Sequence, residues 1–427
     1  MKLAVKPSKL SGQIRAPPSK SYTHRAFIVA ALADGESRIR NPLLSLDTKA
    51  TIEGIKSLGA KVRQKGNEWI VRGTGGRIEP KTEVIDAMNS GTTLRILTAV
   101  AALSKTPVEL TGDQSLLRRP MGALIDALNQ LGASGRCKGP AGRPPVVVGG
   151  GLKGGEVEIT GAISSQFISA LLIAATQAEQ DVEILIPDEL RSKPYVLITL
   201  RVLEKAGARI KHDQELKKFK IRGRQPLQPI QMEIPGDFSS AAFPLGGGAI
   251  TESEVEVTHL DYHDVQGDRR IVEFLREFGA EVEVRPNSVA VHGAFLSGSE
   301  FDCGDTPDLV PILAVLGSVA DGTTEILNVP HLRIKESDRI KSLALGLSRL
   351  GARVKELPDG LKIRGVKELK GTVVESFGDH RIAMAFVVAG LVARGETLVE
   401  GAESIPVSYP SFVEDMRKLG AKIEELT

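Results

Sequence analysis

The sequence of 427 residues is poor in aromatic side chains and has almost no charge imbalance. Phe, Trp and Tyr make up 4% of the chain, which argues against aromatic platforms that stack on single-stranded nucleic acid. The formal net charge is +2, so the strongly basic surface typical of nucleic-acid-binding proteins is missing. We therefore expect a soluble enzyme without a nucleic-acid partner.

Cysteine, metal-ligand motifs and long apolar runs are also scarce. Cys137 and Cys303 are isolated, which favours a reducing cytoplasm over a disulfide framework, and the seven histidines show no metal-ligand spacing. No apolar run approaches the roughly 18 to 20 residues of a membrane span, and residues 1–10 lack a signal-peptide core. We expect a cytoplasmic protein with no metal and no membrane contact.

A short phrase built around Gly-Ala recurs through the chain. The chain is too long for one core of usual size, so two domains are expected. Each copy of the phrase ends an apolar-periodic helix at glycine and leads into a strand, and the glycines are 69 to 75 residues apart. They are Gly59, Gly132, Gly207, Gly279, Gly351 and Gly420. This spacing predicts six copies of one α/β unit.

A second helix start lies about 40 residues before each of these glycines. The helix that follows is almost wholly apolar, as over residues 309–316, which predicts that the first helix of every repeat is buried. If the N-termini of six such helices met, their dipoles would favour a polyanionic ligand. The alternative is that the six starts are structural caps only.

The first of these helix starts is Pro18-Ser19-Lys20-Ser21-Tyr22-Thr23-His24-Arg25. Proline bars helix before this point, the serines can cap free backbone N–H groups, and Lys20 and Arg25 add positive charge at the positive end of the dipole. The segment therefore predicts a phosphate or carboxylate site. An ordinary capped helix with two solvated cations is the alternative.

Neither of two common nucleotide-binding motifs is supported by this sequence. Gly149 to Gly154 matches GxGxxG, but the alternating segment 156–159 predicts a strand where a dinucleotide fold needs a helix, and a glycine hairpin is favoured. The chain contains no GxxxxGK[ST] stretch, so a P-loop is also unsupported.

The segment from His331 to Arg339 places four cationic or potentially cationic side chains and two carboxylates within nine residues. A solvated helix start is one interpretation. The other is a site in which Lys335 and Arg339, one helical turn apart, share a face. Asp308 lies at another of the six helix starts, where nearby cations and helix N-termini can keep it ionised as a base.

Together these segments resemble the 5-enolpyruvylshikimate-3-phosphate synthase family of enolpyruvyl transferases over the whole chain. The matching motifs, in family order, are Pro18-Ser19-Lys20-Ser21 with Arg25, Asn89-Ser90-Gly91-Thr92 with Arg95, Arg119-Pro120, Ser164-Ser165-Gln166-Phe167, Ser192-Lys193-Pro194-Tyr195, Pro307-Asp308, Arg333 to Arg339 and Asp379-His380-Arg381.

The resemblance implies an α/β fold of two lobes, an inside-out barrel-like arrangement with three βαβαββ repeats per lobe. The buried helices would point their N-termini at the cleft between the lobes, which would close on substrate. One lobe would be discontinuous, formed by residues 1–17 and 236–427, and residues 18–235 would form the inserted lobe. We expect a monomer.

By the same resemblance, the enzyme transfers the enolpyruvyl group of phosphoenolpyruvate to the 5-hydroxyl of shikimate 3-phosphate by addition and elimination, releasing phosphate without a cofactor. Asp308 would deprotonate the 5-hydroxyl, Glu336 would protonate the methylene carbon, and Lys20 would touch both substrates. Shikimate 3-phosphate would be held by Lys20, Ser21, Arg25, Ser164, Ser165, Gln166, Ser192, Asp308 and Lys335. Phosphoenolpyruvate would be held by Lys20, Gly91, Arg119, Gln166, Arg339 and Arg381. His380 and Tyr195 would be supporting contacts or purely structural residues.

The chain departs from the family pattern at two positions, where His331 replaces an asparagine and Val407 a lysine of some members. The second change removes a cation, so Val407 is not assigned to the site. The Gly91-Thr92 pair resembles the form that admits glyphosate in place of phosphoenolpyruvate. Two alternatives stay open: the sister transferase acting on UDP-N-acetylglucosamine, whose mobile-loop cysteine has no counterpart in residues 112–118, and a non-catalytic anion-binding protein built from repeats.

Overall fold

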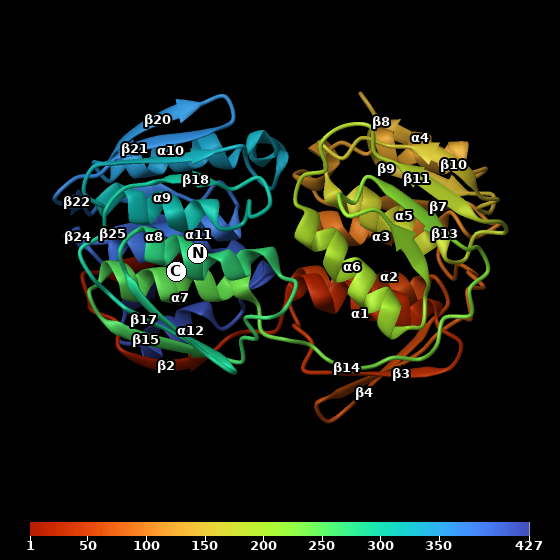
Figure 1. Cartoon of the computed structure of the whole chain (residues 1–427), viewed down its shortest axis with the longest axis horizontal. Helices are drawn as coiled ribbons and strands as arrows, with labels where there is room; N and C mark the ends of the chain where they lie inside the picture. The colour runs from red at the N-terminus through yellow and green to blue at the C-terminus, as the bar shows by residue number, and fades with distance from the viewer. Residues whose placement is uncertain (427) are drawn as a thin grey trace. The chain divides into compact units, whose positions relative to one another are not determined.

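The computed structural model describes residues 1–426, which form two compact units. Unit 1 comprises residues 1–17 and 235–426, and unit 2 comprises residues 18–234 (Figure 1). The second boundary therefore falls one residue before the position predicted from the sequence. Each unit is described separately below.

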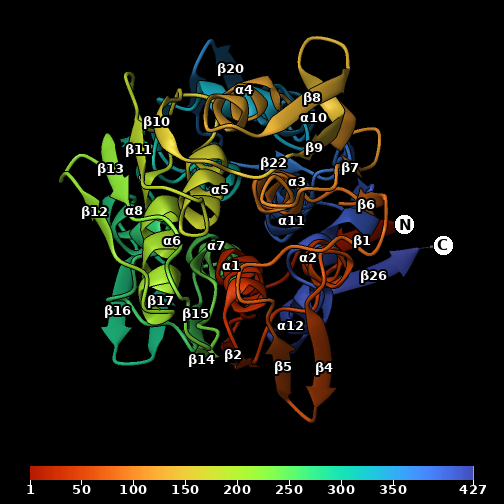
Figure 2. The same cartoon turned by 90° about the vertical axis from the view of Figure 1, so that its right-hand side faces the viewer.

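Unit 2 contains three repeats of the pattern strand, helix, strand, helix and hairpin. Its helices are α1 (Lys20–Leu32), α2 (Leu46–Ser57), α3 (Gly91–Ala101), α4 (Gly122–Gln130), α5 (Ser165–Ala175) and α6 (Lys193–Lys205). Its strands are β3 (Glu36–Arg40), β4 (Lys61–Lys65), β5 (Glu68–Arg72), β6 (Val84–Asp86), β7 (Val108–Thr111), β8 (Ser134–Gly139), β9 (Arg143–Gly149), β10 (Gly155–Glu158), β11 (Val182–Leu185), β12 (Ile210–His212), β13 (Lys218–Ile221) and β14 (Gln231–Glu233). The hairpin of β4 and β5 is easily followed in Figure 2.

Unit 1 repeats the same pattern three times. Its helices are α7 (Phe238–Ile250), α8 (Ile271–Glu277), α9 (Val310–Val319), α10 (Arg339–Arg349), α11 (His380–Gly390) and α12 (Phe412–Lys418). Its strands are β1 (Lys2–Lys6), β2 (Gly12–Arg15), β15 (Glu254–Thr258), β16 (Glu281–Arg285), β17 (Ser288–His292), β18 (Glu300–Asp302), β19 (Thr323–Leu327), β20 (Arg353–Leu357), β21 (Gly360–Arg364), β22 (Leu369–Lys370), β23 (Val373–Glu375), β24 (Ala393–Arg394), β25 (Thr397–Glu400) and β26 (Lys422–Leu426).

Every repeat forms a four-stranded sheet in which the first two strands are parallel and the other pairs are antiparallel. The orders are β14-β3-β5-β4, β6-β7-β9-β8 and β10-β11-β13-β12 in unit 2, and β2-β15-β17-β16, β18-β19-β21-β20 and β23-β25-β1-β26 in unit 1. The predicted α/β fold with six βαβαββ repeats is confirmed.

Three strands complete repeats that lie far away along the chain. β1 is the last strand of the sixth repeat, β2 is the first strand of the fourth, and β14 is the first strand of the first repeat. The chain therefore enters unit 2 after β2 and leaves it after β14. Residues near both ends of the sequence close the same sheet in unit 1, because β1 lies between β25 and β26.

The first helix of each repeat is buried, as its composition predicted. In unit 1 these helices are α7, α9 and α11, which pack against one another, and every residue of α9 except Val319 is buried (Figure 1). An all-apolar helix is stable only where its whole circumference is removed from water. The equivalent helices of unit 2 are α1, α3 and α5, which are also almost wholly buried.

The six repeat glycines end the second helix of their repeats, and all six have positive φ, between 78° and 109°. After α2, for example, the Ala60 N–H donates to the Ile55 carbonyl at 3.1 Å, as in a Schellman cap. Because L-residues with a Cβ are strained at positive φ, glycine recurs where each helix turns into its strand.

The Gly149–Gly154 segment is a connection and not the glycine hairpin that we favoured. β9 ends at Gly149, and the strand that follows, β10, belongs to a different sheet. Gly154 and Gly155 have φ values of 109° and 112°, so the glycines allow the chain to pass from the second repeat to the third. No helix follows Gly154, which agrees with the rejection of a dinucleotide motif.

Candidate functional site

In unit 2, the predicted residues gather at the N-termini of the buried helices. Lys20 is the first residue of α1, and its Nζ lies 3.0 Å from the Asp47 Oδ2. Both side chains are largely buried, with 14% and 7% of their surface exposed. Asp47 was not identified from the sequence, because its partner lies 27 residues away and meets it only when α1 and α2 pack.

Ser19 does not cap α1 in the way that the sequence suggested. It occupies the N-cap position, but its side chain makes no capping hydrogen bond. Its Oγ is buried, and no hydrogen-bonding partner for it occurs within residues 1–426. By contrast, Ser90 accepts a hydrogen bond from the Thr93 N–H at the start of α3, and Ser164 accepts one from the Gln166 N–H at the start of α5.

Arg25 lies inside unit 2 and joins three helices. Its guanidinium donates to the Thr199 Oγ1 at 2.7 Å on α6 and to the Ser169 Oγ at 3.2 Å on α5. It also donates to the carbonyls of Ser21 and Tyr195, at 3.0 and 3.1 Å. Burial lowers the pKa of Arg25 to about 10, so it remains a cation at neutral pH.

His24 is buried beside these cations. Its Nδ1 lies 2.7 Å from the Thr51 Oγ1 on α2. Burial, and then the positive charges of Lys20 and Arg25, lower the pKa of His24 well below its usual value. The imidazole is therefore neutral at physiological pH, and the cationic charge at this helix start comes from Lys20 and Arg25.

A second group of predicted residues surrounds the start of α3. A Cβ added to Gly91 would lie 2.9 Å from the Arg119 Nη1 and 3.6 Å from the Gln166 Oε1. Arg119 donates to the Asn89 Oδ1 at 3.1 Å, and the Gln166 Nε2 donates to the Thr92 Oγ1 at 3.0 Å. The structure thus brings together Gly91, Arg119 and Gln166, three residues expected to hold the same ligand.

Arg95 supports this group from α3. Its Nη1 donates to the Ser164 Oγ at 3.1 Å and to the Gln166 Oε1 at 2.8 Å. Its guanidinium also lies 5.0 Å from the centre of the Phe167 ring. Arg95 therefore fixes two predicted ligand-binding residues, although the sequence identified it only as part of a motif.

In unit 1, Arg339 is the centre of a buried ion cluster. It is 1% exposed and lies 2.8 Å from Asp308, 2.8 Å from Glu336 and 2.7 Å from Asp379. Burial acts to lower the pKa of Arg339, but the charges of Asp379, Glu336 and Asp308 outweigh it and raise the pKa. The cluster unites the segments before α9, α10 and α11.

Arg381 completes the cluster from the first turn of α11. Its Nη2 lies 2.9 Å from the Asp308 Oδ2, so Asp308 is held between two arginines. Asp379 accepts the Arg381 N–H as the N-cap of α11. The ring of His380 is buried, with its Nδ1 4.0 Å from Asp379. Two cations facing Asp308 favour its ionised form, which is the form needed by a base.

The segment around Lys335 differs from its prediction. Lys335 follows the short helix η3 (Pro330–Ile334) and precedes α10, whose N-cap is Asp338. Lys335 and Arg339 therefore do not share a helical face. Glu336 still reaches Arg339, through a bend in the chain and not through helical spacing.

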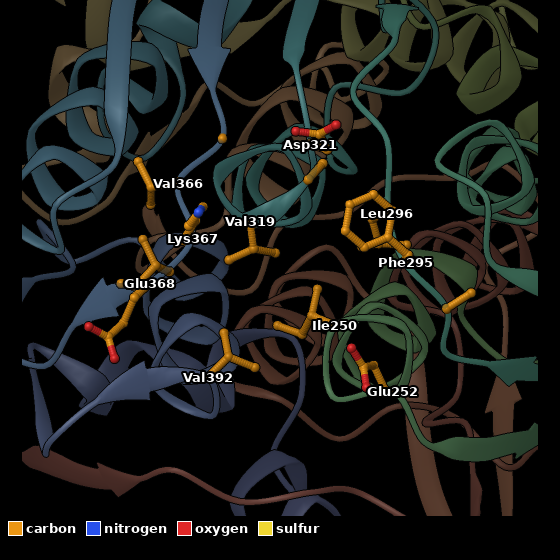
Figure 3. Close-up of a pocket in the computed structure, with 14 residues that line it drawn as sticks. Ile250, Glu252, Phe295, Leu296, Val319, Asp321, Val366, Lys367, Glu368 and Val392 are labelled. Atoms are coloured by element: carbon orange, nitrogen blue, oxygen red, sulfur yellow. The ribbon is translucent and has the colours of Figure 1, made fainter.

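The cavity drawn in Figure 3 is not a plausible anion site. It has a volume of about 430 Å³ and lies in unit 1 at the C-terminal ends of α7 and α9, where Figure 3 shows Ile250 and Val319 beside it. Glu252, Asp321, Glu368 and Lys367 also line it, so carboxylates outnumber the single cation. Helix C-termini and carboxylates both repel anions. The ten residues of α9 place this end roughly 15 Å from the Asp308 end.

No cluster of three or more His, Cys, Asp or Glu side chains suited to a metal ion occurs among residues 1–426. In the same part of the chain, no helix has the length and apolar character needed to cross a bilayer.

Comparison with known proteins gives concordant matches along nearly the whole chain. A family model described as EPSP synthase (3-phosphoshikimate 1-carboxyvinyltransferase) matches residues 5–416. The 3-phosphoshikimate 1-carboxyvinyltransferase of Methanothrix thermoacetophila is 47% identical, with 100% of both chains covered. That of Methanocaldococcus jannaschii is 44% identical, with 99% of each covered. A solved structure of EPSP synthase from Acinetobacter baumannii, 28% identical, covers 99% of this chain and 100% of its own, with a TM-score of 0.82.

Proposed function

Because the chain belongs to the EPSP synthase family, we propose that it transfers the enolpyruvyl group of phosphoenolpyruvate to the 5-hydroxyl of shikimate 3-phosphate and releases phosphate. Among the contacts of the candidate site, the one that best supports this reaction is the Asp308 carboxylate between Arg339 and Arg381. A carboxylate kept ionised by two fixed cations is suited to remove a proton from a hydroxyl group.

The proposed roles in unit 1 concern proton transfer. Asp308 accepts the proton of the 5-hydroxyl as that oxygen attacks the phosphate-bearing carbon of phosphoenolpyruvate. Glu336, which lies 2.8 Å from Arg339, delivers a proton to the methylene carbon when it is in its protonated form. Arg339 and Arg381 supply positive charge for phosphoenolpyruvate, and Lys335 contributes to holding shikimate 3-phosphate. Cations that are fixed before substrate arrives stabilise developing negative charge without reorganisation.

The proposed roles in unit 2 concern anion binding. Lys20 contacts both substrates from the start of α1. Gly91, Arg119 and Gln166 hold phosphoenolpyruvate, since they lie together near the starts of α3 and α5, where a Cβ at position 91 would lie 2.9 Å from the Arg119 Nη1. Shikimate 3-phosphate is held by Ser21, Arg25, Ser164, Ser165, Gln166 and Ser192. Helix N-termini with free N–H groups favour such anions.

The test is phosphate release from phosphoenolpyruvate by the purified chain. We expect release only when shikimate 3-phosphate is present. Release with UDP-N-acetylglucosamine in its place would instead assign the activity of the sister transferase. Asp308→Asn and Glu336→Gln should each lower kcat about 10²- to 10⁴-fold, the usual contribution of a general acid or base. Wild-type turnover in both variants would disprove the assigned chemistry. A monomeric, cytoplasmic enzyme stays a prediction.

A further inference from the structure

Two buried threonines of unit 2, Thr51 on α2 and Thr199 on α6, occupy the same position in their repeats. Each lies eight residues before the repeat glycine that ends its helix. The other four repeats have large, buried, apolar residues at this position. They are Leu124, Ile271, Leu343 and Phe412. The fold itself therefore does not require a hydroxyl group here. Because a buried hydroxyl is unfavourable unless it is hydrogen-bonded, its partners indicate why threonine occurs in these two repeats.

Thr199 holds the guanidinium of Arg25, which is proposed to bind shikimate 3-phosphate. The Arg25 Nε donates to the Thr199 Oγ1 at 2.7 Å. The Thr199 Oγ1 also lies 2.8 Å from the Ser169 Oγ and 3.0 Å from the Tyr195 carbonyl oxygen, so its own position is fixed by α5 and α6. The side chains of Arg25, Ser169 and Thr199 are all buried. An apolar residue at position 199 would leave the Nε–H of Arg25 without this acceptor.

Thr51 makes the corresponding contact with α1 from α2. Its Oγ1 lies 2.7 Å from the His24 Nδ1 on α1 and 2.7 Å from the Thr93 Oγ1 on α3. The Thr93 hydroxyl lies 2.7 Å from the Oγ of Ser90, the N-cap residue of α3. All four side chains are buried. This chain of hydrogen bonds therefore joins α1 to the residue before Gly91, which is proposed to hold phosphoenolpyruvate.

Two successive residues of α1, His24 and Arg25, thus join it to α2 and α6, the two helices that carry the threonines. Lys20 lies one turn before His24, and its partner Asp47 lies one turn before Thr51. α1 and α2 are therefore joined by an ion pair at their starts and by a neutral hydrogen bond one turn further along. Two contacts one turn apart restrict both sliding and rotation of α1 against α2.

We propose that Thr51 and Thr199 are positioning residues that fix the ligand-binding start of α1. Thr199 directs Arg25 towards shikimate 3-phosphate, and Thr51 links α1 to the residues that hold phosphoenolpyruvate at the start of α3. The identity of the two ligands rests on the proposed function. Because the two threonines act through different neighbours, each should affect the binding of a different substrate. A purely structural role would not produce this difference.

The test measures the KM values for both substrates in Thr199→Val and Thr51→Val. Valine removes only the hydroxyl group and is apolar, like the residues of the other four repeats. Thr199→Val should raise the KM for shikimate 3-phosphate on the order of tenfold, as expected for the loss of a hydrogen bond to a charged group. Thr51→Val should raise the KM for phosphoenolpyruvate about fivefold, as expected for a neutral hydrogen bond. In each variant the other KM should stay within about twofold of wild type. Unchanged KM values, or equal rises for both substrates, would overturn the proposal.

Two kinds of control separate the hydroxyl group from the packing of the core. Thr199→Ser and Thr51→Ser keep the hydroxyl and should have KM values close to those of wild type. If the serine variants behaved like the valine variants, the lost methyl contacts and not the hydrogen bonds would be responsible, and the proposal would fail. Thr98→Val is the matched control, because Thr98 is buried on α3 and its Oγ1 donates to the Leu94 carbonyl of the same helix at 2.7 Å. Its KM values should equal those of wild type, and rises as large as those in Thr51→Val would contradict the proposal.

Hydrogen exchange at Arg25 tests the role of Thr199 without relying on enzymatic activity. The NMR signal of the Arg25 Nε–H, assigned by its loss in Arg25→Lys, should exchange with solvent on the order of tenfold faster in Thr199→Val than in wild type. If it does, but phosphate release does not depend on shikimate 3-phosphate, the proposed function fails while the fixing of Arg25 by Thr199 stands. If the exchange rate is the same in both proteins, the inference about Thr199 is wrong.

Discussion

Replacing Arg339 with glutamine should destabilise unit 1 strongly and selectively. Arg339 is 1% exposed, and its guanidinium lies within 2.8 Å of three carboxylates, those of Asp308, Glu336 and Asp379. Removing one partner of a buried ion pair costs about 3–5 kcal/mol, because the other charge stays buried without compensation. Since Arg339 forms ion pairs with three carboxylates, we expect the free energy of unfolding to fall by an amount at the upper end of this range, about 5 kcal/mol.

The chain allows this loss to be assigned to one unit. Trp69 is the single tryptophan and lies on β5 of unit 2, where its ring packs edge-on against Phe27 at 5.9 Å between centroids. During urea unfolding, tryptophan fluorescence therefore reports on unit 2, and far-UV circular dichroism reports on both units. We expect Arg339→Gln to give an early transition by circular dichroism that the fluorescence of Trp69 does not share.

A matched substitution on the same helix controls for the loss of an arginine as such. Arg349 is exposed in the last turn of α10, so Arg349→Gln should change the free energy of unfolding by no more than about 0.5 kcal/mol. If Arg339→Gln cost less than about 1 kcal/mol, or no more than the control, the ion cluster would not contribute to stability as argued. If the early transition were instead seen by Trp69 fluorescence, unit 2 would be the destabilised unit, and the prediction would be wrong.

Three other changes have defined outcomes. Gly91→Ala places a Cβ 2.9 Å from the Arg119 Nη1, so steady-state kinetics should show a raised KM for phosphoenolpyruvate and little change in kcat; an unchanged KM would argue against ligand binding there. Lys20→Met removes a cation 3.0 Å from Asp47 and should lower kcat/KM about 10²- to 10³-fold, whereas wild-type kinetics would exclude Lys20 from the site. The raised pKa of Asp268, about 7 against an ordinary 3.8, means that its contribution to stability is complete below about pH 4 and lost as the pH rises to 7. Urea unfolding of Asp268→Asn should therefore lack a decline of up to about 4 kcal/mol that wild type shows over this interval; equal slopes would refute the shift.

The repeat was predictable because its cause is local. A helix that ends in a left-handed residue favours glycine at that position. Gly59, Gly132 and the four later glycines therefore mark the end of the second helix in every repeat. The buried helices were predictable for a similar reason, since a sequence that is apolar on all sides can only lie inside. The boundary strand β14 was not identified, because its three residues become a strand only by pairing with β3, almost two hundred positions earlier.

The site residues also fall into those that the sequence identifies and those that only the folded structure shows. Lys20, Arg339 and Arg381 stand in motifs that can be identified along the sequence. Their partners Asp47 and Asp379 are brought close by packing between helices, and the sequence does not show which carboxylate meets which cation. The bend that carries Glu336 to Arg339 was likewise hidden, because helical spacing suggested a continuous helix where α10 begins only at Arg339.

The capping residues of the buried helices differ between the two units, and this difference affects how each helix start interacts with an anion. In unit 2 the N-cap residues are Ser19, Ser90 and Ser164, whose hydroxyls are neutral and leave the positive end of each helix dipole available to an anionic ligand. In unit 1, Asp237 and Asp379 occupy the equivalent N-cap positions of α7 and α11.

An aspartate carries a full negative charge, which exceeds the roughly half positive charge of a helix N-terminus. The starts of α7 and α11 would therefore repel anions if no cation lay near them. Arg339 pairs with Asp379, and both arginines pair with Asp308, so these fixed cations offset the negative charge. On this reasoning, the starts of α1, α3 and α5 favour an anion directly, whereas the starts of α7 and α11 depend on neighbouring arginines to do so.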